Sequence, residues 1–356
     1  MQLKGTRCAG ALWMWLGSSA MAANNPVDEN WWPSEFGADD QRGAVNYITP
    51  EKRLEAVKLV KQGKTLTLGM PYHNGMPMVP GRTYSLTIPG AGQPMHGPAP
   101  WQGDEFKHTF NDEFLVSELG QVGTQFDGLA HPMIQVNGQS GWKDGNYMYN
   151  RRRLEDYGHG RGMQVNGIEH VAEVGFFTRG IMLDIPLLKG VDRLEKGQEI
   201  TRADFKQALE KQGIADASQG DVVLIRTGWI QLWKSYLDAT GHINGSADEV
   251  EAANREFMSG EPGVSAELCD YLARKKISML VTDQGAVEPL GGGNQSPDAP
   301  FGYCHMNLVV RRGIYLFESI DMEGLSQEKV YEFLFTWAPL KLVGATGSPG
   351  NPIVAW

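Results

Sequence analysis

Two segments in which an amphipathic helix runs directly into a short apolar strand constrain the fold more than any other feature of the chain. In the first, FKQALEKQG precedes DVVLIRTG, and Phe205, Ala208 and Leu209 recur at helical spacing ahead of the strand-like residues 222–225. In the second, AELCDYLARKK precedes ISMLVTD, whose residues 277–281 are again apolar and include β-branched side chains. This alternation predicts a mixed α/β fold.

Further elements are predicted from capping residues and apolar spacing. Thr49 suits an N-cap and Pro50 the first helical position, Leu54, Val57 and Val60 recur at helical spacing, and Gly63 can close the helix. The remaining predicted elements are helices capped at Thr201, Ser265 and Ser326 and strands over residues 181–185 and 314–317.

The helix that follows Ser326 would turn Val330, Phe333 and Leu334 inward. No repeat, low-complexity tract or long Ser/Pro linker interrupts the chain, so residues 23–356 are expected to form a single domain. Polar residues end two of the predicted strands, where α/β folds tend to place ligand contacts. These residues are Arg226, Thr227 and Asp283.

Residues 1–22 have the order of a secretory signal peptide. Lys4 and Arg7 form a short positive region, CAGALWMWL is an apolar stretch too short to span a bilayer, and AMA ends in a small-residue cleavage site at Ala22. A buried N-terminal helix is the alternative. We therefore expect an exported protein, periplasmic or secreted, that does not cross a membrane in its mature form.

The charge balance and the cysteine count exclude several classes of function. The chain carries 42 acidic and 32 basic side chains, a net charge of −10, which argues against nucleic acid or an anionic membrane as partner. After Ala22 only Cys269 and Cys304 remain, too few for a CxxC zinc site or a disulfide framework. The sequence permits one bridge and two separate thiols equally well.

The segment most informative about chemistry is GQVGTQFDGLAH, which ends at His131. If residues 121–127 are extended, Gln121, Gly123, Gln125 and Asp127 share one strand face, and three oxygen-bearing side chains can converge on a cation or a polar substrate. His131 follows a glycine-containing turn and could swing back toward them. The alternative is a solvated strand face with a surface histidine.

This segment resembles the signature of the cyclase family, a metal-dependent group that includes kynurenine formamidase and isatin hydrolase. That signature is written H-x-G-T-H-x-D-x-P-x-H, and Gly123, Thr124, Asp127 and His131 stand at its Gly, Thr, Asp and final His. The resemblance continues in family order through the mature chain, in segments such as GIMLDIP, GDVVLIRTGW, ISMLVTDQGAVE and PLKLVGATGSPGNPIVAW. It implies a partly barrel-like central β-sheet core surrounded by helices, of the swivelling β/β/α type, and a homodimer or higher homo-oligomer.

The resemblance also implies a set of metal ligands. In the two-zinc members the signature residues bind metal with a later His and Glu, which match His305 and Glu318 here. Without the resemblance, His305 would be a core histidine and Glu318 half of a strand-end salt bridge. The implied ligands are Gln125, Asp127, His305 and Glu318. If Cys304 and His305 lie on one strand, their side chains face opposite ways and Cys304 should not bind the metal.

Two departures from the signature concern the metal. Gln121 and Gln125 replace family histidines, in a GTQ-x-D-G pattern typical of one branch. An amide oxygen is a hard and weaker donor than imidazole, so the oxygen-rich set suits manganese or magnesium better than a pair of zinc ions. We expect a divalent ion, manganese or zinc before magnesium, at a site that holds one metal or none.

The implied activity is metal-assisted hydrolysis of an amide, formamide or lactone bond in a small substrate. His131 would act as general base and then protonate the leaving group, while Gln121 and Thr124 orient the ligands. Aromatic residues near the signature could line a pocket or belong to the core: Trp101, Phe106, Trp142, Tyr147 and Tyr149. The alternatives are a Ser-His-Asp hydrolase, for which no G-x-S-x-G elbow exists, and an exported small-molecule-binding protein that has lost catalysis.

Overall fold

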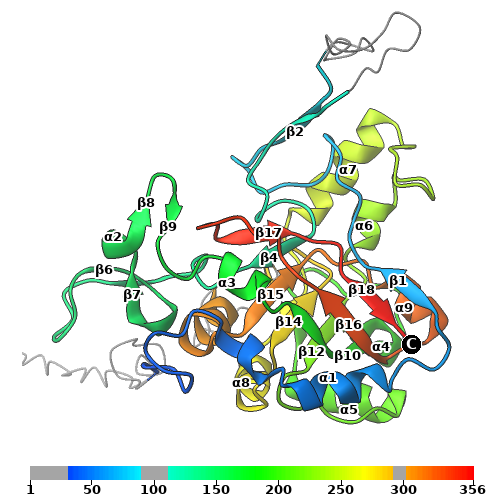
Figure 1. Ribbon diagram of the computed structural model, residues 1–356. Coiled ribbons are helices and arrows are strands. Elements are labelled where there is room, and N and C mark those ends of the chain that lie inside the picture. The colour runs from blue at the N-terminus through cyan, green and yellow to red at the C-terminus, as the bar shows by residue number, and fades with distance from the viewer. Residues whose placement is uncertain (1–30, 90–110, 292–301) are drawn as a thin grey trace, which may run out of the picture.

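A nine-stranded sheet forms the centre of the computed structural model, which describes residues 31–89, 111–291 and 302–356 (Figure 1). The predicted signal peptide and the aromatic residues Trp101 and Phe106 lie outside these residues. In spatial order the strands are β1 (Thr65–Thr67), β18 (Ile353–Ala355), β16 (Glu332–Trp337), β10 (Phe176–Asp184), β12 (Val222–Arg226), β14 (Met279–Thr282), β15 (Tyr315–Glu318), β4 (Gln125–Asp127) and β17 (Gly347–Pro349).

The four central strands β10, β12, β14 and β15 are parallel, and every other neighbouring pair in the sheet is antiparallel. They are the four strands predicted from the sequence, with ends that differ by one residue at the C-terminal side and by up to five at the N-terminal side. Ile185 was placed in the first of them but begins a helix that Asp184 caps. The sheet curls into a half-barrel with helices packed around it, which confirms the predicted fold class.

Helices α1 and α5 both pack against β10, and both are drawn below the sheet in Figure 1. The predicted caps are confirmed: Thr49 accepts from Lys52 N–H, Thr201 forms a capping box with Asp204, and Ser265 accepts from Leu268 N–H. The longer helices are α1 (Pro50–Val57), α5 (Arg202–Gln212), α7 (Ala247–Phe257) and α8 (Ala266–Arg274), and the shorter ones α2 (Leu154–Tyr157), α3 (Glu169–Ala172), α4 (Ile185–Lys189), α6 (Gln231–Lys234) and α9 (Glu323–Glu328). Two 3-10 turns, η2 (Gly43–Tyr47) and η3 (Tyr149–Arg151), and a π-helix, η4 (His305–Val310), complete the described helices.

Two sequence-based expectations about helices are wrong. Gly63 does not close the first helix, because α1 ends at Val57. Leu54 and Val57, at helical spacing, are 66% and 46% exposed, and α1 packs on β10 through the small side chain of Ala56. Ser326 does not cap a helix but lies inside α9, which ends at Lys329 with a left-handed φ of 56°. The apolar residues that follow form β16, whose Phe333, Phe335 and Trp337 are buried on one face, while Leu334 is buried between the half-buried Glu332 and Thr336 on the other. The spacing of Val330, Phe333 and Leu334 also fits a helix, so this short run does not separate strand from helix.

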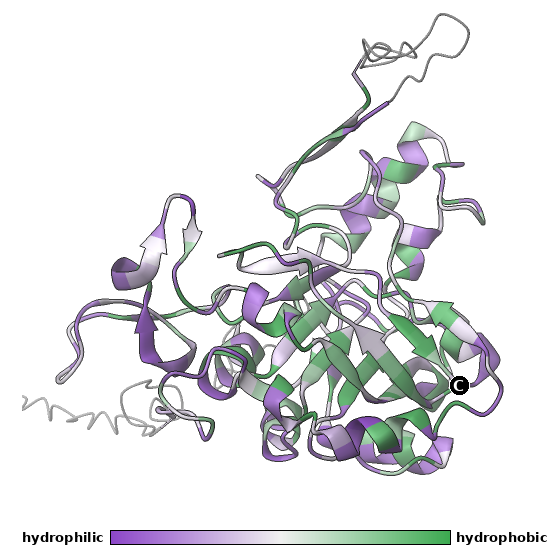
Figure 2. Ribbon diagram, in the orientation of Figure 1, coloured by the Kyte–Doolittle hydropathy of each residue, from purple (hydrophilic) through white to green (hydrophobic). Residues whose placement is uncertain are grey.

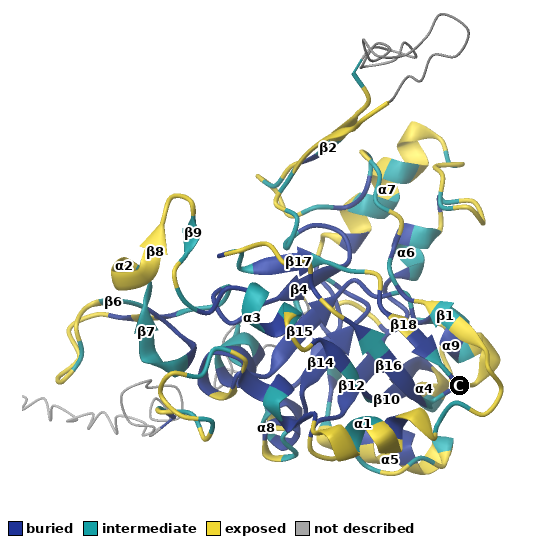
Figure 3. Cartoon of the chain, in the orientation of Figure 1, coloured by how far each residue is buried: buried dark blue, intermediate teal, exposed yellow. Residues whose placement is uncertain are grey.

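The core lies between the central strands and the helices beneath them. Figure 2 shows these strands as almost continuously hydrophobic, and Figure 3 shows them buried along their length. β12 and β14 are buried at every position. This burial is typical of parallel strands that are covered on both faces. The buried strands support the edge of the sheet near β15 and β4.

Smaller sheets extend from this body. The hairpin β2 (Tyr84–Thr87) and β3 (Phe114–Ser117) points away from it at the top of Figure 1. A second extension carries β5 (Ile134–Val136), β6 (Gly145–Met148), β7 (Arg152–Arg153), β8 (Gly158–His159) and β9 (Gly162–Met163), and β11 (Glu199–Ile200) pairs with β13 (Gly263–Val264). Of the helices in the described residues, none is both long and apolar enough to span a membrane.

The polar residues at the ends of β12 and β14 contact one another. Asp283 accepts hydrogen bonds from the backbone and hydroxyl of Thr227 and from Gly228 N–H. Arg226 pairs with Asp184 at 2.8 Å and with Glu323 at 2.7 Å. These hydrogen bonds and ion pairs join the strand ends to neighbouring parts of the fold. The geometry of Arg226, Thr227 and Asp283 therefore does not meet the expectation that they mark ligand contacts.

Candidate metal centre

The strand pair β4–β15 brings three polar side chains to one edge of the sheet. Gln125 lies directly opposite Glu318, and Asp127 lies opposite Leu316. Alternate residues of a strand face the same side, so Gln125, Asp127 and Glu318 share a face. Phe126 points the other way into the core, where its ring stacks on Tyr315 with centroids 5.0 Å apart.

His305 reaches this face from the first position of the π-helix η4. Its Nε2 lies 3.4 Å from Asp127 Oδ2 and 3.4 Å from Glu318 Oε1. One ligand atom from each of the three residues fits within 4.8 Å of the others, and no second group of this kind occurs in the part of the chain that the structure describes. π-helical turns are frequent at functional sites because they reorient a side chain within a helix.

The donor set suits a cation. Asp127 Oδ2 and Glu318 Oε1 are buried and have no hydrogen-bond partner among the described residues. Buried carboxylate oxygens without a partner are costly, and these two lie around one point together with an imidazole nitrogen. Two carboxylates and one imidazole are ligands that zinc and manganese accept. The residues present therefore fit a divalent ion.

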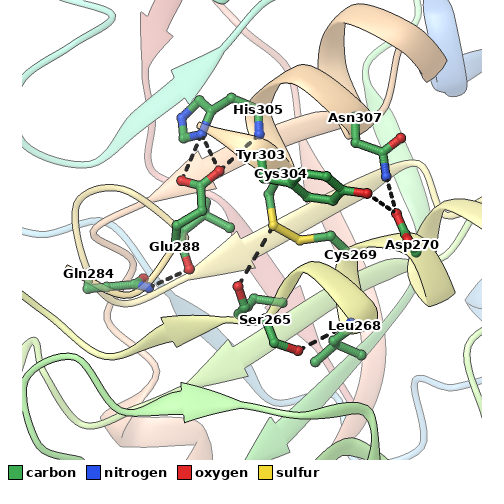
Figure 4. The surroundings of a disulfide bond; sticks show 12 residues. Ser265, Leu268, Cys269, Asp270, Gln284, Glu288, Tyr303, Cys304, His305 and Asn307 are labelled. Atoms are coloured by element: carbon green, nitrogen blue, oxygen red, sulfur yellow. Dashed lines mark hydrogen bonds and ion pairs between the residues drawn. A yellow bond between two sulfur atoms is a disulfide. The ribbon is translucent and has the colours of Figure 1, made fainter. Parts of the chain in front are cut away.

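Glu288 holds His305 in the required orientation. Both of its carboxylate oxygens lie 3.0 Å from His305 Nδ1, and Oε1 also accepts from His305 N–H at 3.1 Å (Figure 4). The carboxylate fixes the proton on Nδ1 and leaves Nε2 to face Asp127 and Glu318. Sequence reasoning missed Glu288. The available signal was a carboxylate in ISMLVTDQGAVE, shortly after a buried strand.

Cys304 and His305 do not lie on one strand, so the condition set from the sequence for keeping Cys304 away from the metal is not met. Cys304 is the N-cap of η4, and its sulfur is bonded to Cys269 of α8 (Figure 4). The segment begins a helix because the disulfide, the contact of Glu288 with His305, and the hydrogen bond from Asn307 to Asp270 all hold its first turn. A sulfur in a disulfide offers no thiolate, so Cys304 is not available as a ligand.

The three candidate ligands shift one another's pKa values. Burial favours the neutral form of Asp127, but the neighbouring His131 and His305 outweigh it and keep the pKa of Asp127 below its ordinary value. Burial, followed by the charge of Asp127, raises the pKa of Glu318 to about 7. Burial opposes a charged His305, yet Glu288, Asp127 and Glu318 raise its pKa well above the ordinary value. The site thus favours added positive charge.

His131 returns toward this group as predicted, through the turn that follows β4. Its backbone N–H donates to Gly128 O at 3.0 Å, and its Nε2 lies 3.7 Å from Asp127 Oδ1. Burial lowers the pKa of His131, and the positive charges of His305 and Arg82 act in the same direction, against the opposing effect of Asp127. A neutral imidazole therefore lies beside the candidate ligands near neutral pH.

The three remaining predicted site residues contact the ligands or their neighbours. Gln121 Nε2 donates to Asp127 Oδ1 at 2.8 Å, and Gln125 Nε2 donates to Glu318 Oε2 at 2.5 Å. Thr124 accepts from Met70 N–H and donates to Ser319 O, both at 2.8 Å, which ties β4 to the residue after Glu318. In this geometry Gln125 approaches the group with its amide nitrogen, so it serves as a hydrogen-bond donor and not as a fourth oxygen ligand.

The extended conformation considered for residues 121–127 holds only in its second half. Only Gln125–Asp127 is a strand, and Gly123 has a φ of 65°, which turns the chain. A side chain at Gly123 would meet the ring of Tyr72, which would lie 2.5 Å from its Cβ. Tyr72 contacts this turn because its hydroxyl donates to Thr124 O. This turn lets Gln121 reach Asp127 from outside the strand.

A cavity adjoins the two glutamines. Its apolar wall includes Met78, Val122, Phe257 and Leu290, and its polar wall includes Gln121, Gln125 and Glu261. Of the aromatic residues considered for a pocket wall or the core, the three that the structure describes do not line this cavity. Trp142 and Tyr147 pack with Trp31 in a separate apolar cluster, and Tyr149 belongs to the main core. Sequence reasoning missed Glu261, because nothing in EPGVS distinguishes this carboxylate from a surface one.

Comparison with known proteins places this site in a family. The Cyclase family model matches residues 66–289, and His305 and Glu318 follow that segment. The crystal structure of a novel cyclase shares 30% of its residues with the chain, covers 90% of this chain and 96% of its own, and has a TM-score of 0.69. No curated protein sequence matches.

A more distant likeness concerns the fold. An isatin hydrolase bound to the product analogue thioisatinate has 17% identity and a TM-score of 0.50, with 86% of this chain and 98% of that one covered. The family model matches more than half of the chain, and the 30% identical structure covers nearly all of it. Both agree with the resemblance of GQVGTQFDGLAH to the family signature. The chain therefore belongs to the cyclase family.

Proposed function

We propose that the protein is a metal-dependent hydrolase that cleaves an amide, formamide or lactone bond in a small molecule. One observation carries this proposal: two buried carboxylate oxygens, Asp127 Oδ2 and Glu318 Oε1, lack a hydrogen-bond partner among the described residues and lie 3.4 Å from the same nitrogen of His305. Two buried carboxylates that converge on one imidazole nitrogen form the donor set of a cation site, and a bound divalent ion would compensate the cost of their burial.

Asp127, His305 and Glu318 would hold the ion, which we expect to be manganese or zinc, with magnesium a further candidate. When bound, a divalent ion supplies positive charge that polarises a substrate carbonyl and lowers the pKa of a water molecule. Gln121 and Gln125 donate to the outer oxygens of Asp127 and Glu318, so the two carboxylates stay directed at one point.

His131 is proposed as the general base. Its Nε2 is the nitrogen that faces the candidate ligands, and its lowered pKa leaves that nitrogen free to accept a proton from water near neutral pH. Asp127 Oδ1, at 3.7 Å, then stabilises the imidazolium. In the second half of the reaction Nε2 returns the proton to the leaving nitrogen or oxygen.

The substrate would occupy the cavity that Gln121 and Gln125 share with the apolar wall of Met78, Val122 and Phe257. This wall excludes water from the reacting bond and favours a small, largely apolar molecule. The cavity therefore suits aryl formamides, cyclic amides and lactones better than highly charged substrates.

The test combines metal analysis with an activity screen. Purified protein is analysed for bound metal, and formanilide, phthalide and phthalimide are then offered with added Mn²⁺, with Zn²⁺ and with a chelator. We expect close to one ion per chain and hydrolysis that the chelator abolishes and metal restores. Stoichiometric metal without turnover of any compound would favour a binding protein, and chelator-resistant turnover would exclude the metal mechanism.

A further inference from the structure

Another cavity lies where the extension β5–β9 meets residues 38–41. Its volume is about 660 Å³, which is within the range of sites for small molecules. It shares no lining residue with the cavity beside Gln121 and Gln125, and none of the candidate metal ligands lines it. The proposed hydrolysis does not use this cavity.

Basic side chains dominate its lining, and Figure 2 shows β7 as strongly hydrophilic. Four basic residues contribute to the lining against two acidic ones: Lys143, Arg151, Arg152 and Arg153 against Asp39 and Asp156. Arg153 is already paired, with Asp156 at 2.5 Å and with Glu155 at 3.9 Å. The other three basic groups give the cavity a positive charge on a chain whose net charge is −10. A cavity lined by one sign of charge concentrates ions of the opposite sign.

Arg151 is held in a fixed orientation by neutral partners. Its guanidinium lies between the rings of Trp32 and Trp142, 4.1 Å from each ring centre, and its Nη2 donates to Gly141 O at 3.0 Å. These contacts fix the plane of the group and leave most of its N–H donors unused. Among the residues that the structure describes, no carboxylate pairs with Arg151.

Arg152 is held in a similar way. Its Nη1 donates to Asp40 O at 3.0 Å and to Asn166 Oδ1, and its Nη2 donates to Ala38 O at 3.3 Å. All three acceptors are neutral, and within the described ranges Arg152 has no carboxylate partner. The contacts therefore orient the charge without neutralising it. Because a guanidinium in a protein stays protonated, the half-buried charge is better compensated by an anion than by a proton shift.

The backbone brings these two arginines to one cavity. Neighbouring residues of an extended strand point to opposite sides, so Arg151 and Arg152 could not both line it from a regular strand. Asn150 and Arg151 instead have left-handed φ values of 60° and 58°, which cost energy for residues other than glycine. Asn150 holds this turn, since its Oδ1 accepts from Ser34 N–H at 2.8 Å and its Nδ2 donates to Gly37 O at 2.9 Å.

We propose that this cavity binds a small dianion, a dicarboxylate or a phosphate monoester, through Arg151 and Arg152. The planar fork of a guanidinium donates to two oxygens at once, and carboxylate and phosphate groups both match that geometry. Lys143, which is exposed at the rim, adds attraction without a fixed geometry. The site is independent of the proposed hydrolysis, so either assignment can fail without the other.

The test is calorimetric titration of the full chain at low ionic strength with succinate, with glycerol 3-phosphate and with neutral dimethyl succinate. Binding of succinate identifies a carboxylate site and binding of glycerol 3-phosphate a phosphate site. Arg151→Gln and Arg152→Gln should each weaken that binding by roughly tenfold or more, as expected for lost charge-assisted hydrogen bonds. Lys143→Gln should weaken it by about twofold to fivefold, the usual effect of an exposed ion pair.

Two controls locate the site. Arg255→Gln removes the same charge from an exposed position on α7, which lies across the molecule from β7 in Figure 1, and should bind as wild type does. Asp127→Ala should also bind as wild type does, because it alters only the candidate metal centre. Thermal unfolding shows whether the variants are folded. If the arginine variants are not folded, the loss in Lys143→Gln against Arg255→Gln decides.

Three results would overturn the assignment. The first is that neither dianion binds to the wild-type protein, or that dimethyl succinate binds equally well. The second is an equal loss of affinity in Arg255→Gln and in the cavity variants, which would mean a general attraction to positive charge. The third is loss of binding in Asp127→Ala, which would place the dianion at the metal centre.

Discussion

His305 directs Nδ1 at both carboxylate oxygens of Glu288, each 3.0 Å away, and thereby directs Nε2 at Asp127 and Glu318. The two residues come from neighbouring parts of the fold, because Glu288 ends the loop after β14 and His305 begins η4. The orientation of the imidazole ring is thus set from outside the group of candidate ligands. The strength of metal binding should depend on a residue that cannot touch the ion.

Replacement of Glu288 by Ala should weaken the binding of Mn²⁺ by about 10–100-fold, the usual effect of removing a carboxylate that orients a histidine ligand. The affinity of Glu288→Gln for Mn²⁺ should lie between those of wild type and Glu288→Ala, because its amide oxygen still accepts from His305 Nδ1–H. Calorimetric titration of chelator-treated protein measures the affinities, and Glu328→Ala, at an exposed position, is the control. Wild-type affinity in Glu288→Ala would show that His305 does not bind the ion.

The proposed roles of Asp127 and His131 separate by experiment. Asp127→Ala removes a ligand, so metal content should fall and activity with it. His131→Ala should keep its metal and lose about 10²–10⁴-fold in kcat, the contribution typical of a general base. Metal analysis measures the metal content of each variant, and steady-state kinetics on a confirmed substrate measure kcat. The control is His159→Ala, at an exposed position. Full activity in His131→Ala would contradict the assignment.

The pH profile should report the lowered pKa of His131. A base must be neutral, so kcat/KM should be at its plateau above that pKa and decline as the pH falls through it, at a value below 6.5. Arg82→Gln removes one of the positive charges that lower this pKa, so the acid limb should move to higher pH. Arg255→Gln, on the surface of α7, should leave it in place. An acid limb above 6.5, or one that Arg82→Gln does not move, would argue against His131.

The parts of the fold that sequence reasoning predicted are those with a strong local signal. The strands β10, β12, β14 and β15 and the caps at Thr49, Thr201 and Ser265 depend on apolar runs or on hydrogen bonds within four residues. The helix expected after Ser326 is wrong because Val330, Phe333 and Leu334 fit helical spacing, although Phe333 and Leu334 lie in the strand β16. Its identity as a strand comes from pairing with β10 and β18, which no local pattern reveals.

The candidate site divides in the same way. Gln121, Asp127 and His131 lie in one short segment, and the family resemblance supplied His305 and Glu318. Glu288 and Glu261 were missed because each takes its significance from contacts between loops that follow different strands. The turn at Gly123 was missed because its cause, the ring of Tyr72, lies about fifty residues earlier in the chain.

The disulfide between Cys269 and Cys304 closes a loop with a sequence separation of 35 residues. By the loop-entropy relation, its loss should cost about 4 kcal/mol of unfolding free energy. Urea unfolding of Cys269→Ser and Cys304→Ser should show similar losses, with the double variant no worse than either. Metal content should stay unchanged in all three. Loss of metal from Cys304→Ser alone would mean that its sulfur binds the ion.

The hairpin β2–β3 is the surface through which we propose that two copies of the chain associate. Phe114 and Val116 are 55% and 63% exposed on one face of β3, and Leu115 is exposed on the other face. The hairpin stands clear of the body in Figure 3, so nothing in the described part of the body covers these side chains. Adjacent apolar residues on both faces of an extended hairpin are unusual for a monomer.

We therefore expect light scattering to show a dimer or larger homo-oligomer. The double variant Phe114→Glu, Val116→Glu should dissociate. Val174→Glu, at an exposed position outside the hairpin, should keep the wild-type mass. A monomeric wild-type protein, or a double variant that remains assembled, would exclude the hairpin as the contact.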